Sequence, residues 1–211
     1  MSKELEIEIL KKLKTIRKSK ILDVGAGDLR HKIDVFSLYG NRYFSIDVKK
    51  SGHKGFKNPD KFFDGEKIPY LSNSFDVVIL TEVFEHVQNI DKLVLDIKRV
   101  LKKNGKLIFS VPFLWPEHEI PYDFRRLTSY GLKYYFKKKG FKILHYKKLN
   151  KGLNALGYII SSEMSKNNYK HNYFLDNFFR YSVKILIIVL KKFYSFKNLY
   201  SGSFAVLKKI S

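Results

Sequence analysis

The chain contains no cysteine among its 211 residues. It therefore carries no disulfide, no thiolate metal site, no iron–sulfur cluster and no cysteine nucleophile. No signal peptide is visible, because residues 1–20 alternate charges along a helical pattern. The most apolar stretch, residues 174–194, is broken by Arg180 and Lys184, which argues against an uninterrupted membrane span. These absences lead us to expect a cytoplasmic protein.

Acidic residues are scarce relative to basic ones. The chain has 20 Asp and Glu and 41 Lys and Arg, which gives a net charge of +21. Such a charge favours anionic partners, namely nucleic acid, anionic lipid or an acidic substrate. A general enrichment in lysine explains the charge equally well, and the sequence has no arginine cluster suited to bidentate phosphate recognition. Hydrophobic residues make up 45% of the chain, so we expect residues 1–211 to form one globular domain with a full core.

A glycine turn follows the first apolar stretch of the chain. Residues 20–24 read as a short buried strand that runs into Gly25 and Gly27. Glycine allows a tight turn and a close approach of the backbone to a ligand, because it has no Cβ. About twenty residues later, a second apolar stretch ends on Asp47, and a carboxylate at a strand end can accept hydrogen bonds from a ribose diol. Together these features predict a nucleoside-containing cofactor bound where the strands end.

The spacing of the glycines narrows the choice of cofactor. A dinucleotide fingerprint needs a third glycine where this chain has Arg30, and no Gly-Lys pair has the spacing of a P-loop. The D-x-G-x-G pattern from Asp23 to Gly27 instead resembles motif I of the class I S-adenosylmethionine-dependent methyltransferases. The resemblance, of the methyltransferase type 11 kind, continues in order through residues 62–70, 73–87 and the helix–glycine–strand passage at 90–112.

The resemblance implies an α/β fold with a Rossmann-like seven-stranded sheet, mostly parallel with an antiparallel last strand, and helices on both faces. The strands are expected at residues 20–24, 42–47, 61–64, 75–80, 106–111, 141–148 and 203–209. The helices are expected at residues 3–17, 29–38, 90–101 and 129–139. The run at 75–80 is almost continuously apolar, which is typical of a parallel strand covered on both faces, and Gly140 is placed to end the preceding helix.

S-adenosylmethionine is the cofactor that the resemblance implies, and motif I would hold its amino-acid end. Gly25 and Gly27 would form the close turn beside that end of the ligand. Asp23 and Glu82 would lie near its ammonium group, either directly or through water.

Two further segments would hold the nucleoside in the same family. Asp47 would accept the ribose hydroxyls, and the alternative is a solvated loop carboxylate. Asp64, with Gly65, would lie near the adenine amino group, although the loop at this place varies among such folds.

A second distinctive segment follows the fifth expected strand. Its H-x-x-P-x-D-x-x-R spacing, from His118 to Arg126, resembles a branch of these enzymes found with bacterial surface-polysaccharide biosynthesis. His118 titrates near neutrality and could accept the proton of a hydroxyl acceptor, while Asp123 could orient the imidazole, bind a sugar hydroxyl or act as base. Arg126 could hold an anionic group. The alternative is that Asp123 and Arg126 only brace the loop, and His86 is a second candidate base.

Several target classes are disfavoured by what is missing. Enzymes that methylate amino groups of nucleic acids often carry [DNS]-P-P-[YFW] where residues 81–84 read Thr-Glu-Val-Phe, and no appended RNA-binding module fits the remaining length. No convincing set of clustered acidic ligands is visible, so no metal is expected. We therefore expect methyl transfer to a small molecule or glycan intermediate, at oxygen, with no nucleic-acid partner. The alternatives are an RNA methyltransferase, favoured only by the charge, and a non-catalytic cofactor-binding scaffold.

Residues 150–200 form a long helical insert between the last two expected strands. Its second part, residues 174–194, is apolar and flanked by Lys191 and Lys192. It is either a buried packing helix or lid over the active site, or an interfacial helix in peripheral contact with an anionic membrane at its inner face. The sequence specifies no oligomeric state.

Overall fold

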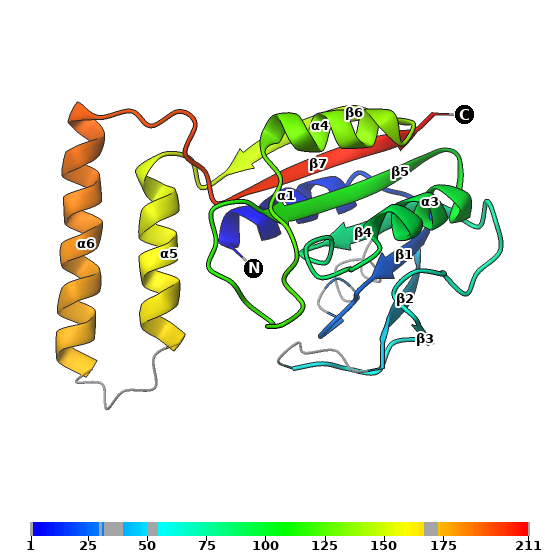
Figure 1. Ribbon diagram of the computed structural model, residues 1–211, viewed down its shortest axis with the longest axis horizontal. Coiled ribbons are helices and arrows are strands. Elements are labelled where there is room, and N and C mark those ends of the chain that lie inside the picture. The colour runs from blue at the N-terminus through cyan, green and yellow to red at the C-terminus, as the bar shows by residue number, and fades with distance from the viewer. Residues whose placement is uncertain (1, 30, 32–39, 50–54, 167–172, 211) are drawn as a thin grey trace.

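The computed structural model describes residues 2–29, 31, 40–49, 55–166 and 173–210. Seven strands form one sheet in the order β3-β2-β1-β4-β5-β7-β6 (Figure 1). The strands are β1 (Lys20–Val24), β2 (Arg42–Val48), β3 (Lys61–Phe63), β4 (Phe75–Thr81), β5 (Leu101–Pro112), β6 (Phe141–Leu149) and β7 (Gly202–Lys209). The first five strands are parallel and β7 runs antiparallel to both of its neighbours, which confirms the predicted Rossmann-like topology.

Five helices lie in the described part of the chain, and their bounds differ in places from the prediction. They are α1 (Lys3–Leu13), α3 (Ile90–Val100), α4 (Ser129–Lys138), α5 (Leu153–Lys166) and α6 (Tyr173–Phe193). Helix α1 is shorter than predicted, because Thr15 and Ile16 already donate to carbonyls three residues back and the Asn41 side chain caps the Ile16 carbonyl. The helix predicted at residues 29–38 falls mostly outside the described residues.

Helices cover both faces of the sheet. On one face, the apolar side of α1 (Leu5, Ile9 and Leu13) packs on residues of β1 and β4 such as Ile21 and Ile79. On the other face, α3 and α4 bury their apolar sides in a second cluster with β5. Strand β4 lies between the two layers and is buried on both sides, as its continuous apolar sequence predicts.

The sheet reverses its direction of growth between β1 and β4. From β1 the chain adds β2 and β3 on one side, and from β4 it adds β5 on the other. In open α/β sheets, ligands bind outside the carboxyl ends of the strands at such a reversal. The segments after β1, β4 and β5 are therefore the ones that the fold brings together around a site.

Helices α5 and α6 form an antiparallel hairpin that stands beside the sheet (yellow and orange in Figure 1), with α6 outermost. The two helices approach closely at Gly157, where a Cβ would lie 2.5 Å from Ile187 Cδ1. The sequence left two alternatives for the second helix of the insert, a buried packing helix or lid and an interfacial helix, and the exposed side chains of α6 do not fit a buried packing helix. Phe178, Ile185 and Phe193 are 65%, 61% and 74% exposed, because α6 contacts α5 rather than the body of the sheet.

Candidate active site

A cavity of about 760 Å³ opens at the carboxyl ends of the central strands. Its wall is built from the turn after β1, the ends of β4 and β5, the loop after β5, and parts of α1 and α5. Trp115 of that loop stacks on Tyr158 of α5 with ring centroids 4.9 Å apart, so the hairpin closes one side of the cavity. The polar residues of the wall include Asp28, His31, Thr81, Glu82, His86, Glu117, His118 and Glu119.

The glycine turn lines this cavity with its backbone. Gly25 and Gly27 have φ angles of +71° and +54°, in the left-handed region that favours glycine. The Gly25 amide donates to the Ile46 carbonyl at 2.9 Å, which ties the turn to the end of β2. A Cβ at Gly25 would lie 2.4 Å from Val83 Cγ2, so glycine is required here by space as well as by conformation.

Asp47 braces the glycine turn from the neighbouring strand. Its Oδ2 accepts a hydrogen bond from the Gly27 amide at 2.8 Å, and its Oδ1 accepts one from the Val48 amide at 2.7 Å. The residue is 5% exposed and is not among the described residues that line the cavity. Its carboxylate thus fixes the position of the turn that the sequence predicts to hold the cofactor.

Asp23 is not among the described residues that line the cavity. It is 1% exposed and accepts a hydrogen bond of 2.7 Å from the Tyr43 hydroxyl, in the layer beneath α1. Burial and the nearby Asp23 carboxylate raise the pKa of Tyr43 far above its usual value, so the phenol remains a donor. The structure does not bring Asp23 to the cavity wall with Glu82.

Asp64 and Gly65 lie in an exposed loop after β3 and do not line the cavity as described. Asp64 Oδ1 accepts hydrogen bonds from the amides of Lys67 and Glu66 at 2.7 and 2.8 Å. These backbone donors lower the pKa of Asp64, with the Lys67 amide contributing most. Gly65 adopts a φ of +90°, which the turn requires.

Glu82 does line the cavity, directly after β4. Its carboxylate accepts a hydrogen bond of 2.7 Å from the Ser110 hydroxyl on the neighbouring strand β5. Burial raises the pKa of Glu82. Its backbone has a φ of +55°, which turns the chain sharply where the strand ends.

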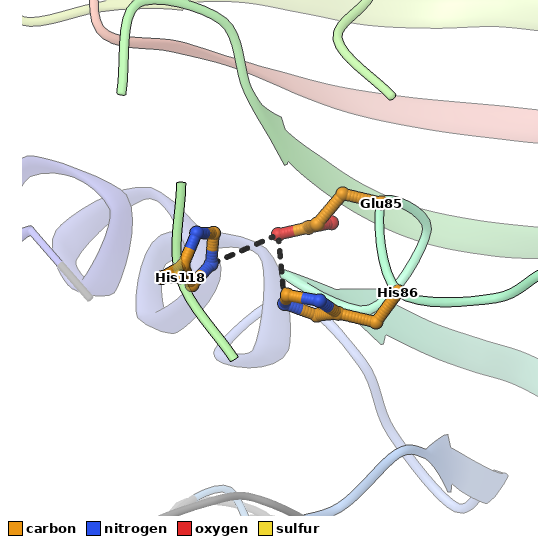
Figure 2. A group of neighbouring side chains, drawn as sticks. All are labelled: Glu85, His86 and His118. Carbon is orange, nitrogen blue, oxygen red and sulfur yellow. Dashed lines mark ion pairs between the residues drawn. The ribbon is translucent and has the colours of Figure 1, made fainter. Parts of the chain in front are cut away.

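Two imidazoles from different loops meet over one buried carboxylate (Figure 2). Glu85 Oε1 lies 3.7 Å from His86 Nε2 and 3.9 Å from His118 Nε2. The two rings are 4.7 Å apart and nearly perpendicular. Burial, followed by the charge of Glu82, raises the pKa of Glu85 well above its usual value. Burial and the nearby His86 lower the pKa of His118, although Asp123 opposes this effect.

Asp123 and Arg126 form an ion pair, and Asp123 also contacts His118. Arg126 donates from both terminal nitrogens to the two Asp123 oxygens, at 2.5 and 2.7 Å. Asp123 Oδ2 also accepts from the His118 amide at 3.0 Å and lies 3.2 Å from His118 Nδ1. Burial alone would raise the pKa of Asp123, but these hydrogen bonds lower it to about 2. The pair orients His118, and Arg126 is already occupied by an internal partner.

Sequence reasoning did not assign roles to several residues of the wall. His31 is 5% exposed and its Nε2 lies 3.3 Å from the Thr81 hydroxyl at the end of β4. Trp115 and Tyr158 come from segments far apart in the sequence. Position after the glycine turn could have indicated His31, but no sequence pattern predicts the contact between Trp115 and Tyr158.

Comparisons with known proteins agree with this arrangement. Residues 22–109 match the family described as a methyltransferase domain. An uncharacterized methyltransferase of Bacillus subtilis, YcgJ, is 30% identical over 115 residues, which cover 49% of this chain and 42% of that protein. The ubiquinone biosynthesis O-methyltransferase of Rickettsia conorii is 33% identical over 115 residues, which cover 50% of this chain and 39% of that protein. The match thus spans half or less of the length of these curated relatives.

The fold is also found among solved structures. Phosphoethanolamine N-methyltransferase 2 of Haemonchus contortus, solved in complex with S-adenosyl-L-methionine, superposes with a TM-score of 0.60 at 16% identity. That superposition covers 97% of this chain and 52% of the other. At this identity the likeness concerns the fold alone. Residues 22–109 thus match a methyltransferase domain, and the chain shares the fold of a protein that was solved with S-adenosyl-L-methionine.

Proposed function

We propose that the protein transfers the methyl group of S-adenosylmethionine to a hydroxyl oxygen of a small-molecule or glycan intermediate. The observation that carries the proposal is that the glycine turn and His118 line one cavity. Gly25, Gly27 and Glu82 would hold the amino-acid end of the cofactor. The acceptor would enter on the side of Trp115 and His118, and alignment of the two substrates would supply most of the acceleration.

His118 is the group proposed to activate the acceptor hydroxyl. Its Nδ1 faces Asp123 and the Pro116 carbonyl, which leaves Nε2 free of a proton on the cavity side. A lowered pKa keeps the imidazole neutral at pH 7, as a proton acceptor must be. Methylation at oxygen is also the activity named for the Rickettsia relative, and the motif from His118 to Arg126 resembles that of surface-polysaccharide enzymes.

Methyl transfer is tested by following a labelled methyl group from S-adenosylmethionine into an acceptor. The protein would be incubated with methyl-labelled S-adenosylmethionine and a panel of free sugars, sugar nucleotides and lipid-linked glycans. Label is expected in one hydroxyl-bearing class, as an alkali-stable methyl ether. Label that appears only in amines or in RNA, or cofactor binding with no transfer to any acceptor class, would contradict the proposal. The last result would favour the non-catalytic scaffold.

Asp47→Ala is expected to weaken binding of S-adenosylmethionine by about 1.5–3 kcal/mol, the scale of hydrogen bonds to a charged group. The variant would lose the proposed ribose contact and loses the hydrogen bond from the Gly27 amide. Isothermal titration calorimetry measures the change. Asp91→Ala, on the exposed side of α3, removes a carboxylate far from the glycine turn and serves as the matched control. Equal affinities for the two variants would refute the role of Asp47.

RNA is a second acceptor class that the net charge of +21 favours. A mobility-shift titration with RNA over a salt series distinguishes an RNA acceptor from a glycan acceptor. The glycan proposal expects only weak binding that vanishes at physiological salt. Tight binding that persists there, together with label in RNA, would replace the proposed acceptor.

The outward face of α6 is proposed to contact an anionic membrane. Within the described residues no helix is both long enough and apolar enough to cross a bilayer. Helix α6 nevertheless exposes Phe178, Ile185 and Ile188 to solvent, with Lys191 and Lys192 at its end. Lysines near an anionic surface contribute about 1 kcal/mol each. A lipid-linked glycan acceptor would make such a contact useful, because it would keep the enzyme near its substrate.

Salt-sensitive flotation with anionic vesicles is therefore expected for the wild type, with little flotation on neutral vesicles. The double variant Lys191→Glu with Lys192→Glu should float several-fold less, since two attractive charges become repulsive. Lys137→Glu with Lys138→Glu, at the end of α4, changes the net charge equally and should float like the wild type. If the wild-type protein does not bind anionic vesicles at low salt, the membrane proposal is refuted and a lid is favoured.

A further inference from the structure

Glu85 is a buried carboxylate without a hydrogen-bond partner. It is 0% exposed, and neither of its oxygens is bonded within the described part of the chain. A buried carboxylate without a donor or a cation is costly, and the described side chains supply no hydrogen bond to this one. Both imidazoles beside it, His86 and His118, direct the same ring atom, Nε2, toward its Oε1 (Figure 2).

The outer nitrogens of the two imidazoles are held by the protein. His86 Nδ1 lies 2.7 Å from the Tyr122 carbonyl, and because a carbonyl oxygen only accepts, Nδ1 carries the proton. His118 Nδ1 faces the Asp123 carboxylate at 3.2 Å. Histidines that bind metals show this pattern, in which the outer nitrogen donates to a carbonyl or carboxylate and the inner nitrogen keeps its lone pair for the ion.

The spacing of these atoms is close to that of a metal site. One ligand atom from each of Glu85, His86 and His118 can be chosen so that all lie within 4.8 Å of one another. Ligand atoms around a tetrahedral Zn²⁺, each about 2.0–2.2 Å from the ion, are separated by roughly 3.3–3.6 Å. The observed 3.7 and 3.9 Å from Glu85 to the two imidazoles therefore need only a small contraction.

We propose that Glu85, His86 and His118 bind one divalent transition-metal cation of the Zn²⁺ class. Two imidazoles and one carboxylate suit such cations, and three protein ligands leave a coordination position open for substrate. His86 and His118 line the cavity, so the open position faces the space for the acceptor. Glu119, whose Oε2 lies 3.9 Å from His86 Nε2, stands at the same rim.

The site deepens the proposed function and rests on it for the identity of the acceptor. The hydroxyl oxygen of the acceptor would occupy the open position, where a bound cation favours loss of its proton to solvent. A lone pair of that oxygen then forms the bond to the methyl carbon. The carbon–sulfur bond breaks with its electron pair going to sulfur, which leaves a methyl ether and S-adenosylhomocysteine. In this arrangement His118 Nε2 binds the cation and accepts no proton, so His118 acts on the hydroxyl through the cation instead of as the direct base.

Metal binding is tested on untagged protein that has been treated with a chelator and dialysed. Titration with Zn²⁺ by calorimetry, and with Co²⁺ by visible absorption, is expected to show one cation per chain. Glu85→Gln and His118→Gln should each weaken Zn²⁺ binding at least about 100-fold, since loss of outer partners alone costs 10–100-fold. His145→Gln, on β6 beside Glu8 of α1, removes a histidine outside the cluster and should bind Zn²⁺ like the wild type.

The test separates the metal site from the proposed methyl transfer. All variants are first checked for thermal unfolding and for binding of S-adenosylmethionine, so that a misfolded variant is recognised. A wild type that binds the cofactor but neither Zn²⁺ nor Co²⁺ would overturn the site and leave the methyl transfer standing. Equal Zn²⁺ affinity in the wild type, Glu85→Gln and His118→Gln would also overturn it. A wild type that binds both cation and cofactor yet labels no acceptor supports the site and contradicts the proposed function.

Discussion

His118→Ala is expected to lower turnover by about 10²–10⁴-fold, the usual contribution of a general base, while the affinity for S-adenosylmethionine changes less than about threefold. His118 lines the same cavity as the glycine turn but is proposed to act on the acceptor, whereas the glycine turn is proposed to hold the cofactor. Single-turnover transfer of labelled methyl to the active acceptor class measures the first quantity, and calorimetric titration with the cofactor measures the second.

His145→Ala provides the matched control, because it removes a histidine on β6 that does not line the cavity. A loss of less than about threefold for His118→Ala would make His118 a bystander and His86 the better candidate. Chelation distinguishes the two ways in which His118 could act. A direct base keeps the wild type active in EDTA, whereas a metal ligand makes activity depend on added Zn²⁺.

The mostly parallel seven-stranded sheet could be predicted because the segments from residue 20 to residue 112 resemble a known family in order. Strand β4 is apolar at nearly every position, and the prediction that it lies between two helical layers is confirmed. The directions of single side chains were harder to predict. Asp23 alternates with Leu22 and Val24 along β1, so it lies on the same face as Ile21, beneath α1. This alternation places the Asp23 side chain on the face that α1 covers.

The site depends on contacts that no local pattern encodes. His86 and His118 belong to loops after different strands, and their meeting over Glu85 follows from the adjacency of β4 and β5 and from loop conformation. Because the sequence shows no run of acidic ligands, it did not predict that Glu85, His86 and His118 lie together. One alternative for Asp123 and Arg126 is that they brace the loop by pairing with each other, and the structure contains that ion pair.

Gly25→Ala is expected to destabilise the protein by about 2–5 kcal/mol and to abolish measurable cofactor binding. A left-handed backbone costs a residue with a Cβ about 1–2 kcal/mol. The clash of the new methyl group with Val83, 2.4 Å from the position of the Cβ, adds about 1–3 kcal/mol of overpacking. Denaturant unfolding measures the free energy, and calorimetry measures the binding.

Two further variants separate the backbone effect from the clash at Gly25. Gly40→Ala has nearly the same φ, +70°, but its nearest neighbour is Lys18 Cγ at 3.8 Å, so it should cost only the backbone part, about 1–2 kcal/mol. Val83→Ala removes the methyl groups that the new Cβ would meet. Combined with Gly25→Ala it should therefore recover about 0.5–3 kcal/mol relative to the sum of the single changes. Two results together would contradict this account. One is that Gly25→Ala lowers the free energy of unfolding no more than Gly40→Ala does. The other is that the effects of Gly25→Ala and Val83→Ala are additive, which would mean that the predicted clash with Val83 has no energetic effect.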